Sequence, residues 1–231
     1  MGENLFILPF HLEALCLGTG VIARDGSCLI RAPSIESIEP ELRRLRRLLE
    51  KARLYRSFAS GRIVVETPNT VYELELERGE IRRVRATIIV GSIEGIARQI
   101  PKIVANDPDL LEALKRLHEI DERRAVEILS KHVAPSVVAS IVEGEEDLVR
   151  QMIEDDLPPT ARLRIDTSGG VLKAVIEDDR DPAHTFERLK DRKIVADIAF
   201  SVLDAAVAGT VATVIEEVLR REEDARRLAP L

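Results

Sequence analysis

Residues that build metal and disulfide sites are scarce in this chain of 231 residues. It has no tryptophan, two tyrosines and two cysteines, Cys16 and Cys28, without a CxxC pair. Two cysteines build neither a disulfide framework nor a zinc site. No histidine has the spacing of an HExxH site, so we expect surface or helix-end roles for them and predict no metal. The four histidines are His11, His118, His132 and His184.

Motifs of the common enzyme classes are missing too. The sequence has no G-x-S-x-G elbow and no Walker A motif. Residues 18–23 match the dinucleotide pattern G-x-G-x-x-A, which requires a following helix to hold a pyrophosphate. Asp25-Gly26 favours a turn there, so we predict no nucleotide cofactor. An enzyme would have to assemble its catalytic groups from distant positions, which we consider the less favoured hypothesis.

Charge is what the chain has in abundance. Charged residues make up 32% of it and apolar residues 45%, which is typical of a folded globular protein. The net charge of −7 argues against broad binding to nucleic acids or anionic membranes. Many arginines and few amide side chains indicate a thermophilic source. The N-terminus lacks the basic region of a signal peptide, and we expect a cytoplasmic protein.

Alternating apolar residues predict strands in three places. A hairpin is expected over residues 20–31, three strands over residues 61–90, and a second hairpin over residues 161–176 around Ser168-Gly169-Gly170. Caps and prolines predict helices after Ser92, Asp107 and Asp121, with breaks at Pro135 and Gly144. Further helices are expected before Gly61, from Pro182, and from about Lys193 to Arg221, after which the polar tail is expected to fray.

The stretch TVYELELERGEIRRVRATIIV, residues 70–90, allows a prediction of register. With a three-residue loop at 78–80, Leu74 faces Val84 and Tyr72 faces Ala86. Glu75 then meets Arg83 and Glu73 meets Arg85 on the other face, so that glutamates neutralise the arginines one strand away. We therefore interpret these charges as a cross-strand lattice and not as a free basic surface.

Two other segments are candidates for binding. The first is a basic helix near residues 40–58, which would contact phosphates or an acidic partner, although such runs are more often solvated. Its cations are Arg43, Arg44, Arg46, Arg47, Lys51, Arg53 and Arg56. The second is the acidic run 177–181, which lacks the alternating ligands and glycine of a calcium loop.

The apolar segment 198–215 has Asp204 as its only charged residue. A membrane-spanning helix needs about 20 apolar residues and tolerates a central carboxylate poorly. We therefore expect no membrane span. The apolar surface of this helix is too wide for a surface helix, so we expect it to be central or to form an oligomer contact.

The segment SGRIVVETPNTVYELELERGEIRRVRATIIVGSIEGIARQI has a strand–turn–strand rhythm marked by Gly61, Gly79, Ile81 and Gly95. Over residues 40–105 this pattern resembles the PATAN-type domain at the N-terminus of PatA-like response regulators, and related archaeal proteins. The resemblance implies an interaction module without catalytic residues, and an archaeal source.

Together these patterns predict an α+β fold, in which antiparallel β-meanders and hairpins pack with helices and a long C-terminal helix is buried. We expect one part over residues 1–157 and another over 158–231, divided at Leu157-Pro158-Pro159. The leading hypothesis is a non-enzymatic interaction or regulatory module. It would be a homo-oligomer, or bind a protein partner, through the helix of residues 193–221. Nucleic-acid binding by the basic helix, and an enzyme of unrecognised class using residues 177–181, are the alternatives.

Overall fold

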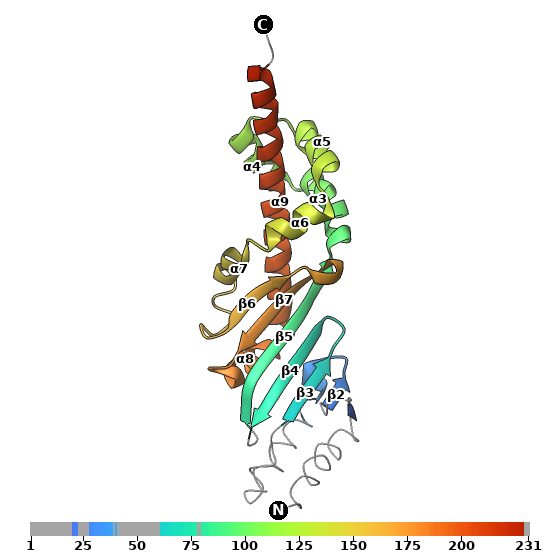
Figure 1. Cartoon of the computed structure of the whole chain (residues 1–231), viewed down its shortest axis with the longest axis vertical. Helices are drawn as coiled ribbons and strands as arrows, with labels where there is room; N and C mark the ends of the chain where they lie inside the picture. The colour runs from blue at the N-terminus through green and yellow to red at the C-terminus, as the bar shows by residue number, and fades with distance from the viewer. Residues whose placement is uncertain (1–19, 23–27, 39, 41–60, 78–79, 229–231) are drawn as a thin grey trace, which may run out of the picture. The chain divides into compact units, whose positions relative to one another are not determined.

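The chain forms an α+β protein, as predicted (Figure 1). The computed structural model describes residues 20–22, 28–38, 40, 61–77 and 80–228. It divides into two compact units, each made of segments distant in sequence. The division into parts 1–157 and 158–231, expected from the sequence, stays a prediction. Of the described residues, the first unit comprises those between 20 and 89, 153–164 and 174–198, and the second comprises 90–152, 165–173 and 199–228.

A mixed sheet contains the described strands, in the order β1-β2-β3-β4-β5-β7-β6. β1 pairs antiparallel with β2, which confirms the first hairpin, and β2 pairs in parallel with β3. Pairs β3–β4 and β4–β5 are antiparallel, as a meander requires. The strands are β1 (Gly20–Ile22), β2 (Cys28–Arg31), β3 (Gly61–Glu66), β4 (Thr70–Glu77), β5 (Glu80–Ser92), β6 (Arg162–Asp166) and β7 (Val171–Asp178).

The register of β4 and β5 is the predicted one. Glu75 lies opposite Arg83 and Glu73 opposite Arg85, with the apolar partners also as expected. The predicted three-residue loop is wrong, because Glu77 already pairs with Glu80. An irregularity between Glu75 and Leu76 shifts the pairing by one residue, and this bulge restores the alternation that keeps charge out of the core.

The inner face of the sheet supplies the core of the first unit. Ile63, Leu74 and Val84, on three neighbouring strands, are buried. Helix α8 (Pro182–Leu189) packs on this core. The ring of Tyr72 meets that of Phe186 edge-on at 6.2 Å, and its hydroxyl donates to the carbonyl of Leu189 at 2.9 Å. A chain segment more than 100 residues downstream thereby covers the meander.

The second unit is helical, with the predicted caps. Ser92 accepts from the amide of Gly95, Asp107 from those of Asp109 and Leu110, and Asp121 from that of Arg124. Each cap satisfies an amide that has no partner in the first helical turn. The helices are α3 (Ile93–Asn106), α4 (Pro108–His118), α5 (Glu122–His132), α6 (Pro135–Val142) and α7 (Glu146–Met152).

The second predicted hairpin is present. β6 and β7 are neighbours in the sheet, and the short connection makes them antiparallel. Ser168–Gly170 forms one turn of 3₁₀-helix between the strands. Gly169 and Gly170 have φ values of 71° and 72°, which glycine adopts without the strain that a side chain would add.

Helix α9 (Arg192–Leu228) buries one side and exposes the other. Its buried positions recur every fourth residue through the second unit. They are Val202, Ala206, Thr210, Val214 and Val218. Gly209 permits a close approach of α6, because a Cβ there would lie 3.0 Å from Cγ2 of Ile141.

The expectation that the tail frays after Arg221 is wrong, since α9 continues to Leu228. Two ion pairs lie at the start of this extension or directly before it. Arg124 of α5 pairs with Glu222, and Arg221 pairs with Glu217 one turn earlier. The sequence shows the second pair by its spacing, but only the fold brings Arg124 to the tail.

Among the described helices, α9 alone is by itself long and apolar enough to cross a membrane, and α5 with α6 would do so only as a pair bent by 97°. In α9, 56% of the apolar window is buried inside the protein, as in the core helix of a globular fold. This burial agrees with the predicted central role of the segment.

Candidate interaction surfaces

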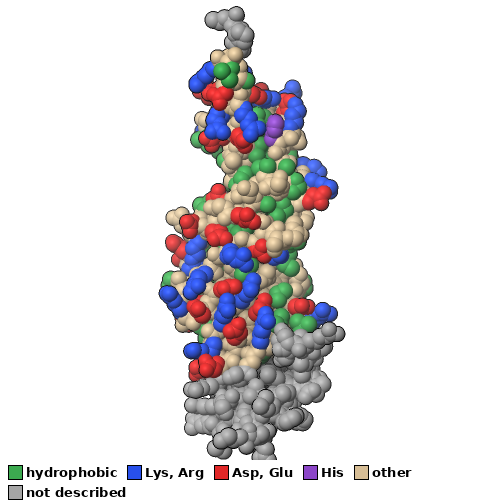
Figure 2. Space-filling model, in the orientation of Figure 1, with side chains coloured by type: hydrophobic (Ala, Val, Ile, Leu, Met, Phe, Trp, Pro, Cys, Tyr) green, Lys and Arg blue, Asp and Glu red, His purple; other side chains and the backbone are tan. Residues whose placement is uncertain are grey.

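The outer face of the sheet carries the lattice predicted from sequence. Figure 2 shows acidic and basic side chains interleaved over the strands. Glu75 lies 3.8 Å from Arg83, and Arg82 lies 2.8 Å from Glu77. Glu73, expected to neutralise Arg85, pairs instead with Arg62 on β3. The face therefore balances its charges, with a different choice of partners.

Glu177 on β7 is the residue that the sequence reasoning missed. Its two carboxylate oxygens lie 3.1 Å from Arg83 and 3.3 Å from Arg85. The hydrogen bond and charge of Glu177 raise the pKa of Arg83 above its usual value. No local pattern could have located this carboxylate, because β7 follows β5 by some 80 residues and becomes its neighbour only in the sheet.

Carboxylates of the acidic run 177–181, the candidate for an enzyme site, form ion pairs with side chains of the same chain. Asp179 lies 3.5 Å from Arg162, and Asp181 lies 3.3 Å from His184. Within the described part of the chain, no group of three or more His, Cys, Asp or Glu side chains is placed to hold a metal ion. The run connects β7 to the helix that begins at Pro182, and the alternative of an enzyme that uses these carboxylates stays a prediction.

Asp178 is the buried member of this run, at 2% exposure. One carboxylate oxygen accepts from the amides of Arg180 and Asp181, at 2.8 and 3.0 Å. The other accepts from the hydroxyls of Thr160 and Thr185, both at 2.7 Å. Burial alone would raise the pKa of Asp178, but these four donors outweigh it and lower the pKa. A fully satisfied, ionised carboxylate is suited to holding the loop before α8.

The three described histidines lie where the sequence placed them. His118 is in the last turn of α4 and His132 ends α5. His184 is on the surface near the start of α8, beside Asp181. Within the described ranges, none of the three belongs to a group of side chains that could hold a metal ion.

One face of α9 remains uncovered in the second unit, and we call it the Phe200 face. Its members, exposed at every fourth position, are Phe200, Asp204, Ala208 and Ala212. Phe200 is 68% exposed. A large aromatic side chain in that position is unusual for a surface helix, because burying it gains free energy. The buried stripe described above lies on the opposite side of the helix.

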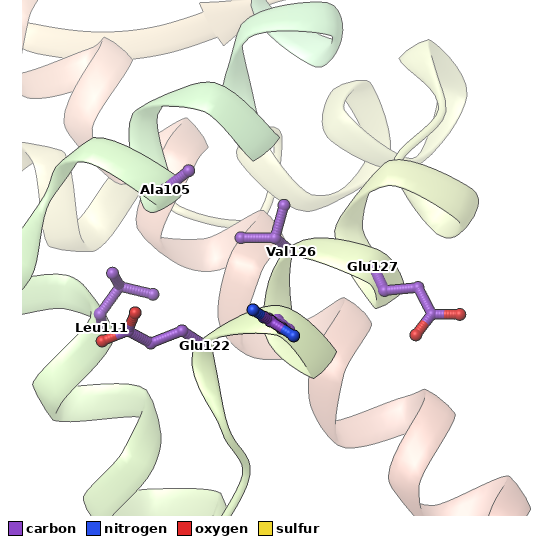
Figure 3. Close-up of a pocket in the computed structure, with 6 residues that line it drawn as sticks. Ala105, Leu111, Glu122, Val126 and Glu127 are labelled. Carbon is purple, nitrogen blue, oxygen red and sulfur yellow. The ribbon is translucent and has the colours of Figure 1, made fainter.

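A groove runs between α3 and α5 in the same unit, and we call it the α3–α5 groove. It consists of two adjoining hollows of about 440 and 550 Å³, which share Ala105 and Val126. In Figure 3, Val126 and Leu111 lie with Ala105 around the smaller hollow, whereas the carboxylate of Glu127 points away from it. The remaining apolar lining comes from Ala97, Pro101, Leu129, Val133 and Pro135.

Charged residues line the rim of this groove, and its acidic members are all paired. Glu94 pairs with Arg98 at 2.5 Å, Glu122 with Lys115 at 2.8 Å, and Glu127 with Lys131 at 2.5 Å. The rim cations Lys102 and Arg123 form no ion pair with any described residue. The groove thus presents apolar surface flanked by unpaired positive charge.

Two sequence candidates lie outside the described residues. The basic helix falls on residues 41–60, so nucleic-acid binding by its arginines stays a prediction. Residues 18, 19 and 23 of the dinucleotide-like pattern also lie outside the described residues, so the absence of a nucleotide cofactor stays a prediction. The described residues of the pattern, Gly20–Ile22, form β1 and pair with β2.

No family model, curated protein or solved structure matches the chain. The resemblance of residues 40–105 to PATAN-type domains therefore stays a prediction. The geometry of the described residues alone supports the functional proposal that follows.

Proposed function

We propose that this chain is a non-enzymatic interaction or regulatory module that self-associates through α9. The observation that carries the proposal is the exposure of Phe200 on one face of a helix whose opposite face is buried. Aromatic residues are enriched at protein interfaces because they bury much area with little loss of conformational entropy. The chain has only five phenylalanines, so placing one in solvent is a notable use of its limited aromatic content.

The rest of the Phe200 face suits helix–helix contact. Ala208 and Ala212 follow Phe200 on the same side and are exposed. Small side chains let two helices approach to about 8 Å, and a ring from one copy can then pack on the alanines of the other. A two-fold axis would form that contact twice, which is the commonest arrangement in homo-oligomers.

The chemistry of the acidic run supports the non-enzymatic half of the proposal. A catalytic carboxylate is usually shifted in pKa towards neutrality and accessible from a pocket. Asp178 has its pKa shifted the other way, and its oxygens are occupied by four internal donors. These features are those of a structural carboxylate.

We also propose a cytoplasmic location in a thermophilic archaeon. Cys28 is buried and disulfide-bonded. Disulfides are rare in the cytosol of mesophiles but common inside hyperthermophilic archaea. The disulfide and the arginine-rich composition are therefore compatible with one another in such a source.

Sedimentation velocity between about 1 and 100 µM tests the self-association. The expected wild-type species has about twice the chain mass of 25.8 kDa. Phe200→Glu should weaken association more than tenfold, since it places a charge at the centre of the contact. Leu117→Glu is the matched control, because Leu117 is 73% exposed on α4 and outside the Phe200 face. A wild-type monomer throughout the range, or equal effects of both substitutions, would refute the proposal.

A further inference from the structure

We infer that the α3–α5 groove binds an acidic amphipathic helix of a protein partner. The first argument is shape. The hollows follow α3 from Glu94 to Ala105, which is about 16 Å of helix, or three turns. That length matches the apolar stripe of one short amphipathic helix, which binds through residues spaced three and four apart.

The lining of the groove favours a peptide over a nucleic acid. Pro101, Val126 and Val133 are half-buried, and Leu129 lies buried beneath them. Aliphatic side chains of this kind accept leucine or valine side chains by simple burial. Single-stranded nucleic acids are usually bound by aromatic side chains on which bases stack, and none of the described residues that line the two hollows is aromatic.

The charges at the rim of the groove predict the sign of the partner's charge. Every acidic residue at the rim has an intramolecular cation, whereas Lys102 and Arg123 have no ion-pair partner among the described residues. They line different hollows, Lys102 the larger and Arg123 the smaller. A helix with glutamates flanking its apolar stripe could pair with both cations, and a basic helix would meet two like charges.

This inference does not depend on self-association, because the residues of the groove and of the Phe200 face are different. Failure of one proposal therefore leaves the other standing. The groove variants below are measured for peptide binding, and the Phe200→Glu variant for oligomeric state.

The test uses the full chain and a fluorescein-labelled synthetic peptide of about five helical turns. The peptide carries leucines at helical spacing and glutamates on both flanks. A second peptide has lysine in place of each glutamate, and a third is a scrambled version of the first. Fluorescence anisotropy at low salt should show binding of the acidic peptide and little binding of the other two.

The variant Lys102→Glu/Arg123→Glu should weaken binding of the acidic peptide about tenfold, because two favourable contacts become repulsive. The matched control is Arg220→Glu/Arg226→Glu, which reverses two exposed cations on α9 and should leave the affinity unchanged. Ala105→Glu, at an exposed position in the floor, should abolish binding while leaving the thermal melt unchanged.

Equal binding of acidic and basic peptides, or unchanged affinity in the Lys102→Glu/Arg123→Glu variant, would overturn the inference. An oligothymidylate of similar length provides the remaining outcome. The inference is wrong, and the groove binds nucleic acid, if the acidic peptide does not bind while the oligothymidylate binds the wild type and loses affinity in the Lys102→Glu/Arg123→Glu variant.

Discussion

Replacing Asp178 should destabilise the protein to an extent that depends on how many donors lose their acceptor. In Asp178→Ala, four donors lose their acceptor, two amides and the hydroxyls of Thr160 and Thr185. At about 1 kcal/mol for each partly buried donor, the free energy of unfolding should fall by about 4 kcal/mol. Asp178→Asn keeps one carbonyl oxygen that accepts from the two amides. The two threonine hydroxyls can rotate to accept from the new side-chain amide or to donate elsewhere, so the free energy of unfolding should fall by only about 1–2 kcal/mol.

Urea denaturation followed by circular dichroism at neutral pH measures these differences. Asp179→Ala is the matched control, because Asp179 is an exposed neighbour whose ion pair is with the exposed Arg162, at 3.5 Å. Its cost should stay below about 1 kcal/mol. If Asp178→Ala costs no more than Asp179→Ala, the capping role assigned to Asp178 is wrong.

The pH dependence provides a second measurement on the same residue. The pKa of Asp178 is lower in the folded state than in the unfolded chain. The unfolded chain therefore takes up the proton more readily, and stability falls as the pH drops through the lowered folded pKa. Asp178→Asn should lose this component of acid destabilisation. Stabilisation of the wild type, but not of Asp178→Asn, by calcium would show instead that the carboxylate binds a cation.

Two further predictions concern the first unit. Burial raises the pKa of Tyr72 to about 12. The free energy of unfolding should therefore fall by about 1.4 kcal/mol per pH unit between pH 10 and pH 12, and Tyr72→Phe should remove this loss in denaturation experiments across that range. An unchanged slope in Tyr72→Phe would contradict the prediction. Glu177→Gln should lower the free energy of unfolding by about 1 kcal/mol at low salt, because Arg83 and Arg85 lose a shared anion. The cost should be smaller at high salt, where exposed pairs are screened. A cost independent of salt would show that the lattice contributes no charge pairing.

Local patterns of the sequence determined the elements and one register. Ser92, Asp107 and Asp121 cap the helices they were expected to cap, because capping involves amides only two or three residues away. The pairing of Glu75 with Arg83 follows from the alternation of two adjacent strands, since any one-residue slip would bury charge. The length of the loop between those strands did not follow, because a bulge compensates for it.

Tertiary structure alone decided which charged residues form ion pairs and which surfaces stay exposed. Glu177 reaches Arg83 and Arg85 only because β7 lies beside β5, and Arg124 reaches the end of α9 only because the helices pack together. The same packing leaves Lys102 without an ion-pair partner among the described residues. An ion pair or a groove depends on distances between segments far apart in sequence, and the hydrophobic pattern that selects each helix and strand carries no information about them.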